Sequence, residues 1–181
     1  MSRALRRQEA GATYHMMSRG VRKLPIFTTD EDRLMFLRIL AETVRVFGWR
    51  CWAYCLMPNH YHALVVTPEP NVGKGMKRLN GLYAQNFNQR YGFRGHLFED
   101  RYRSVDIVAD EQFVTVLQYV VLNPVRSGMR RARPVAVVEL PGDGRSGAGA
   151  AISRCAGGAA VVRRRPRPRT PALPKLGVLA P

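Results

Sequence analysis

The sequence predicts an α+β fold in which an antiparallel sheet carries helices packed on one face, followed by a low-complexity basic C-terminal tail. Two observations lead to this prediction. Every phenylalanine, tyrosine and tryptophan lies before position 120, so the large side chains that build a core are confined to the first part of the chain. Within that part, segments with strand-like alternation and segments with helical apolar spacing follow one another. We therefore divide the chain into a folded domain, residues 1–130, and a tail, residues 131–181.

The domain is expected to begin with a strand and a helix. Residues 13–18 (TYHMMS) have the composition of an extended segment, which the Arg19-Gly20 pair closes. A helix should begin after Thr29, because the three acids that follow suit the positive end of a helix dipole. Apolar residues then recur at helical spacing until Gly48, which should end this helix.

A hairpin and a second helix are expected next. Residues 49–57 and 60–67 are rich in aromatic and apolar side chains, and Pro58-Asn59 separates them, which predicts an antiparallel hairpin. A second helix is expected over residues 72–91, where apolar side chains share one side and basic side chains lie largely on the other.

A last strand and helix complete the domain. Residues 102–109 (YRSVDIVA) alternate as a strand does, and residues 111–122 have the apolar spacing of a third helix, ended by Asn123-Pro124. The order is strand, helix, strand, strand, helix, strand, helix. An antiparallel sheet of the ferredoxin-like split βαβ kind, shared by RRM-like domains, accounts for that order.

The charge of the chain points to a polyanionic partner. Lysine and arginine number 29 against 13 acids, which gives a formal net charge of +16, divided about equally between domain and tail. Such a surface attracts nucleic acid first of all, although a solvated basic surface without a specific partner is the simpler alternative.

The tail has two interpretations. It contains few large apolar groups and many Pro and Gly residues, so we expect it to be largely disordered, with its RRRPRPR run available for phosphates. Alternatively, a shifted reading frame in GC-rich DNA would give this Ala, Arg, Gly and Pro composition, and the native C-terminal element would then be missing.

Cysteine usage and the N-terminus indicate a reducing compartment. The three cysteines form no disulfide pattern, and Cys51 and Cys55 fit small core side chains better than zinc ligands. We expect no signal peptide, no membrane span and no membrane partner, and hence a cytoplasmic protein associated with the nucleoid.

Two histidines at strand spacing are the first candidates for chemistry. His60 and His62 would point to the same face of their strand and could supply half of a divalent-metal site. Two partly buried histidines with ordinary hydrogen bonds are the alternative. On the third helix, Tyr119 and Asn123 lie one turn apart and would present a phenol and an amide together. The alternatives there are a core aromatic and an ordinary helix stop.

These residues resemble a known family. The motifs MPNHYH, GHLFEDRYRS and YVVLNPVRSG occur in the order found in single-tyrosine HUH transposases, in the branch associated with repetitive extragenic palindromes, over residues 13–129. The resemblance implies that His60 and His62 bind a divalent ion, Mg²⁺ or Mn²⁺, that Asn123 supplies a third ligand, and that Tyr119 is the nucleophile. Residues 1–130 would then be the catalytic domain of a transposase that cuts single-stranded or hairpin DNA through a 5′-phosphotyrosine link and rejoins it.

DNA contacts are expected from a group of basic residues and one aromatic residue, although each of them could equally be a solvated surface residue. The group consists of Arg19, Lys74, Lys77, Arg78, Arg101, Tyr102 and Arg103. A homodimer is a further candidate assembly, with the site completed within one subunit or between two.

Two competing functions stay open. Relatives usually continue past the NPVRSG motif into a Trp-containing segment that this chain lacks, so a decayed protein that binds hairpin DNA without cutting it is the main alternative. A small-molecule metalloenzyme is the weaker one, because it does not explain the charge.

Overall fold

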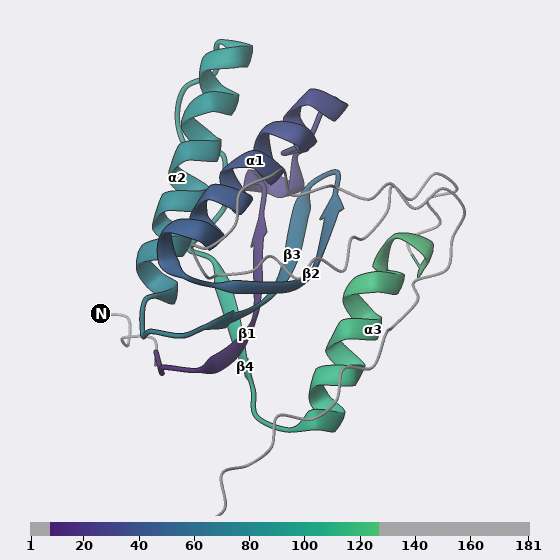
Figure 1. The fold of residues 1–181 in the computed structure, drawn as a ribbon. Coiled ribbons are helices and arrows are strands. Elements are labelled where there is room, and N and C mark those ends of the chain that lie inside the picture. Colours follow the sequence, from purple (N-terminus) through teal and green to yellow (C-terminus); the bar gives the residue numbers. More distant parts are fainter. Residues whose placement is uncertain (1–7, 127–181) are drawn as a thin grey trace, which may run out of the picture.

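Residues 8–126 are described by a computed structural model, and they form a four-stranded antiparallel sheet with three α-helices and one 3₁₀ turn (Figure 1). The tail, residues 131–181, lies outside the described residues. The elements follow the predicted order: β1 (Ala12–Arg19), η1 (Val21–Lys23), α1 (Asp30–Phe47), β2 (Arg50–Met57), β3 (His60–Thr67), α2 (Val72–Tyr91), β4 (Arg103–Ile107) and α3 (Asp110–Arg126). No helix in this part of the chain has the length and apolar character needed to cross a membrane.

The sheet confirms the predicted fold class. Its strand order is β2-β3-β1-β4, with every neighbouring pair antiparallel, as in the split βαβ arrangement. In the register of β1 with β3, Arg19 lies opposite His60 and Met17 lies opposite His62. Because paired residues point to the same face, these four side chains share one side of the sheet.

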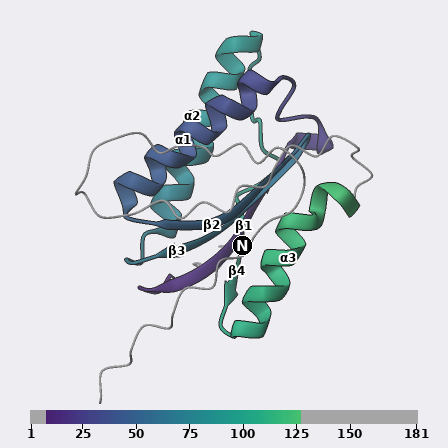
Figure 2. The ribbon, with the colours of Figure 1, turned by 45° about the vertical axis from the view of Figure 1, so that its right-hand side comes forward.

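Helices α1 and α2 cover the other side of the sheet (Figure 2). Tyr14 and Met16 of β1, with Tyr61 and Val65 of β3, point toward these helices and are at most 1% exposed. The expected pair of helices on one face is therefore present, and it encloses the main hydrophobic core.

Helix α3 lies on the face that carries the histidines (Figure 2). There Cys55, Leu64 and Val120 form a second, smaller buried cluster. Strands β2 and β3 are thus covered on both sides, which explains why their sequences are apolar almost throughout. The cysteines behave as predicted: Cys51 and Cys55 are free and buried, one in each cluster, and burial raises the pKa of both thiols to about 12.

Two local details differ from the sequence prediction. The third helix does not end at Asn123-Pro124 but runs on to Arg126, because a proline favours a helix boundary without imposing one. The 3₁₀ turn after β1 was not predicted. Its Arg22 and Lys23 have positive φ angles, of 52° and 61°, which the sequence does not signal because neither residue is glycine or asparagine.

Gly75 of α2 provides a test of the main core. The fully buried ring of Trp49 lies where a Cβ on Gly75 would be, with its Cζ2 only 2.0 Å from that position. We expect Gly75→Ala to lower the free energy of unfolding by about 1–3 kcal/mol, because Trp49 must move. Gly81→Ala on the same helix is the matched control: nothing lies within 4 Å of its Cβ position, and the change should stabilise by about 0.5–1 kcal/mol. Urea unfolding of both variants measures the difference, and equal effects would contradict the expected clash.

Candidate active site

The two histidines of β3 meet on the face covered by α3. The ring centroids of His60 and His62 are 5.0 Å apart, with their planes at 83°. His62 is only 2% exposed, whereas His60 is partly buried. Strand alternation thus brings the two imidazoles together, as their spacing in the sequence predicts.

Asn59 fixes the tautomer of His60. The Nδ2 of Asn59 donates a hydrogen bond to the carbonyl of Lys23 over 3.1 Å, so its Oδ1 is the atom that lies 2.7 Å from Nδ1 of His60. An amide oxygen can only accept, and His60 Nδ1 must therefore donate. The lone pair of His60 then lies on Nε2. The asparagine of the Pro-Asn turn consequently orients the first histidine, a role that turn propensity alone does not reveal.

Both imidazoles are held neutral. Burial, and to a smaller extent the neighbouring imidazoles and Arg19, together lower the pKa of His62 to about 3. Burial and Arg19 also lower the pKa of His60. Neutral imidazole is the form that binds metal ions. Among the described residues, the buried Nε2 of His62 has no hydrogen-bond partner, which is the environment expected of a ligand atom. This donor set fits a divalent ion.

Helix α3 brings the predicted tyrosine to this pair. The ring of Tyr119 meets that of His62 edge-on, with centroids 5.5 Å apart and planes at 90°, and the tyrosine side chain is 40% exposed. Asn123, one turn further along α3, is 7% exposed. The tyrosine therefore lies beside the histidines of its own chain and remains partly exposed to solvent.

A third histidine joins the cluster. His15 of β1 stacks on His62, with centroids 5.0 Å apart, and its Nε2 lies 2.9 Å from Nδ1 of His62. Sequence reasoning missed it. Alternation along β1 places His15 on the same face as Met17, but only the register of β1 with β3 shows that it reaches His62.

The three histidines do not converge on one point. In the part of the chain that the structure describes, no group of three or more His, Cys, Asp or Glu side chains is arranged to hold a metal ion. The nitrogens that His15 and His62 turn toward each other are occupied by their mutual contact. A third ligand would therefore have to be of another type, such as the amide of Asn123.

Three of the predicted DNA-binding arginines gather beside the histidines. Arg19, Arg101 and Arg103 line a cavity of about 330 Å³ at the edge of the sheet, together with Met17 and two acidic residues. Arg19 lies opposite His60, and Arg103 lies in the same cross-strand row as Met17 and His62. This cavity therefore opens next to the candidate site.

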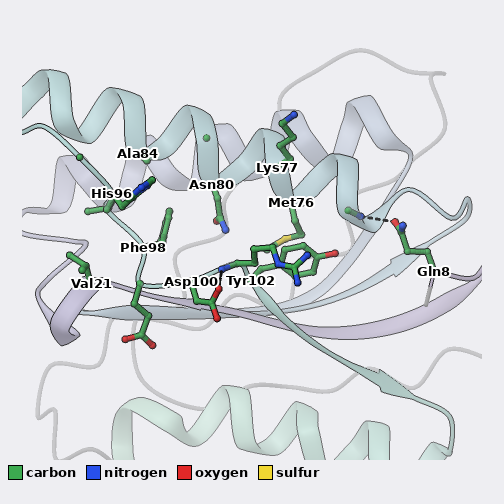
Figure 3. A pocket seen from close by; sticks show the side chains of 16 residues that line it. Gln8, Val21, Met76, Lys77, Asn80, Ala84, His96, Phe98, Asp100 and Tyr102 are labelled. Carbon is green, nitrogen blue, oxygen red and sulfur yellow. Dashed lines mark hydrogen bonds between the residues drawn. The ribbon is translucent and has the colours of Figure 1, made fainter. Parts of the chain in front are cut away.

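A larger cavity, of about 800 Å³, lies between α2 and the segment before β4 (Figure 3). Lys77, Arg101 and Tyr102 line it, so Arg101 belongs to both cavities. Tyr102 is only 8% exposed and packs in the main core, which leaves little of its ring for stacking on a base.

The other two predicted basic residues lie on α2. Lys74 is exposed, and Nη2 of Arg78 lies 3.4 Å from Oε2 of Glu42 on α1. The predicted DNA-binding residues thus divide between the two sides of the sheet.

Comparison with known proteins gives a family and a fold. The family model described as IS200-like transposase matches residues 9–123. A solved structure of the REP-associated tyrosine transposase bound to a REP hairpin is 19% identical, with a TM-score of 0.59, and covers 71% of this chain and 76% of that chain. A candidate transposase from Deinococcus radiodurans R1 is 20% identical, with a TM-score of 0.46, and covers 66% of this chain and 94% of that chain. A comparison with curated proteins gave no match.

Proposed function

The chain belongs to the family of IS200-like transposases, and from this premise we propose that it cuts and rejoins single-stranded DNA through a covalent link to Tyr119. The observation that carries the proposal is the contact between the exposed phenol of Tyr119 and His62, whose Nε2 is buried without a partner among the described residues. The proposed nucleophile and a proposed metal ligand thus have their rings side by side on one chain.

His60, His62 and Asn123 are the residues that would hold a divalent ion, Mg²⁺ or Mn²⁺. Such an ion would act as a Lewis acid on a non-bridging oxygen of the phosphate. Burial lowers the pKa of both imidazoles and so favours their neutral form, and the hydrogen bond to Asn59 leaves the lone pair of His60 on Nε2. No nucleotide cofactor is needed, because the phosphodiester link to tyrosine would conserve the energy of the bond that is broken.

The proposed step is a transesterification. The hydroxyl oxygen of Tyr119 forms a bond to phosphorus and gives up its proton, while the bond from phosphorus to the 3′-oxygen breaks and that oxygen takes up a proton. The products are a 5′-phosphotyrosine and a free 3′-hydroxyl. Attack by another 3′-hydroxyl reverses the step and joins a new strand.

The cavity lined by three arginines supports a proposal for where the DNA strand binds. Arg19, Arg101 and Arg103 provide bidentate donors for phosphates next to His60, and Arg101 continues into the cavity that Lys77 lines on the other side of the sheet. We propose that a strand follows this edge, and that a folded hairpin is the substrate, by analogy with the neighbour bound to a REP hairpin. Such a protein would act at the nucleoid. A homodimer is compatible with this proposal, although the contact of Tyr119 with His62 lies within one chain.

The test is adduct formation. The full chain is incubated with 3′-labelled single-stranded hairpins from the flanks of its own gene, with Mn²⁺, with Mg²⁺ or with a chelator. We expect a denaturant-resistant adduct with a metal only, and peptide mapping should place the DNA on Tyr119. Tight hairpin binding without an adduct in either metal would instead identify a decayed DNA-binding protein. Absence of salt-dependent DNA affinity would exclude both functions.

A further inference from the structure

His15 has no part in the proposed ligand set, yet its ring lies within hydrogen-bonding distance of that of His62. Its Nε2 lies 2.9 Å from Nδ1 of His62, and the two rings stack at 22°. A contact this short between two ring nitrogens contains one hydrogen, so one ring donates and the other accepts. The direction of this bond decides which nitrogen of His62 carries a lone pair.

The buried Nε2 of His62 favours one direction. If His15 donated, His62 would carry its proton on Nε2, and a buried N–H would be left without an acceptor among the described residues. If His62 donates from Nδ1, its Nε2 is instead a lone pair, the form that can bind a cation. His15 is only partly buried, so water can reach the proton that its own Nδ1 then carries.

We propose that His15 is a positioning residue, which accepts a hydrogen bond from Nδ1 of His62 and holds His62 in the tautomer with a lone pair on Nε2. His15 does for His62 what Asn59 does for His60, and each ligand imidazole has its own acceptor. The ring of His15 also meets Tyr119 edge-on, with centroids 6.1 Å apart, so the same side chain contacts both the proposed ligand and the proposed nucleophile. The metal-binding consequence rests on the proposed function, but the tautomer itself does not.

The tautomer can be observed without metal, DNA or catalysis. In the ¹⁵N-labelled full chain, long-range ¹H–¹⁵N spectra distinguish the two tautomers of each of its four histidines. We expect His62 of the metal-free wild type to be protonated on Nδ1. Protonation on Nε2 would overturn the proposal, whatever the adduct assay shows.

Two variants test the consequence for metal binding. His15→Phe keeps a ring of similar shape but removes the acceptor, whereas the amide oxygen of His15→Gln can replace Nε2. We expect Mn²⁺ affinity, measured by calorimetry, to fall by about 10–100-fold in His15→Phe and to recover in His15→Gln. Wild-type affinity in His15→Phe would contradict this role. If wild type binds Mn²⁺ as expected but forms no adduct, the assignment of His15 stands and the proposed enzyme function fails; if wild type binds no Mn²⁺, the metal-binding role of His15 is wrong.

Discussion

Tyr119→Phe should abolish the covalent protein–DNA adduct while leaving hairpin affinity close to that of the wild type. Removal of the hydroxyl oxygen removes the atom that we propose to attack phosphorus, and the ring can still pack edge-on against His62. Loss of a nucleophile typically costs at least about three orders of magnitude in rate, so no adduct should be detectable on gels. The free energy of unfolding should barely change, because the side chain is 40% exposed.

Tyr91→Phe is the matched control for this experiment. Tyr91 lies at the end of α2, on the opposite side of the sheet, where its hydroxyl donates to Asp32 over 2.8 Å. Its loss should reduce stability by about 1 kcal/mol and leave adduct formation by the folded protein intact. An adduct that persists in Tyr119→Phe would show that another residue is the nucleophile. Parallel loss of hairpin affinity and adduct would indicate that Tyr119 acts in binding.

The fold could be predicted from the sequence because each strand and each α-helix carries its own local signal, which the 3₁₀ turn after β1 does not. Apolar spacing defined α2, and the Pro-Asn turn defined the hairpin that carries His60 and His62. The sequence predicts that α3 ends at Asn123-Pro124, whereas the helix continues to Arg126, because a proline favours a helix boundary without imposing one.

Only part of the candidate site could be predicted from the sequence. The spacing of His60 and His62, and that of Tyr119 and Asn123, follow from strand and helix periodicity. The contact of His15 with His62 depends on the register of β1 with β3. The orientation of Asn59 depends on its hydrogen bond to the carbonyl of Lys23, a residue with a positive φ angle. Both are tertiary contacts, and neither leaves a pattern in the sequence.

The side chains that stabilise the fold and those of the candidate site lie on opposite faces of the sheet. The main hydrophobic core lies between the sheet and helices α1 and α2, whereas the histidines lie on the opposite face of the sheet, beside Tyr119 of α3. Substitutions in the core should therefore change how much protein is folded, and substitutions in the site should change what the folded protein does. Asp32 of α1 allows this separation to be tested from the core side.

Asp32→Ala should lower the free energy of unfolding by about 2–4 kcal/mol. The carboxylate of Asp32 is fully buried, and one of its oxygens accepts from the backbone N–H groups of Thr28 and Thr29 and from the hydroxyl of Tyr91, each within 2.9 Å. It thereby joins the start of α1 to the end of α2. Alanine would leave these three donors without their acceptor, and urea unfolding measures the loss.

Asp32→Asn separates the hydrogen bonds from the charge. Its amide oxygen can take the place of the accepting oxygen, so only the ion pair with Arg90, at 3.6 Å, is lost. Because Arg90 is 42% exposed, that pair contributes little, and Asp32→Asn should cost clearly less than Asp32→Ala. Equal losses would mean that the charge, and not the acceptor, stabilises the two helices. In both variants the folded fraction should form the Tyr119 adduct at the wild-type rate, because Asp32 lies on the opposite side of the sheet from the site.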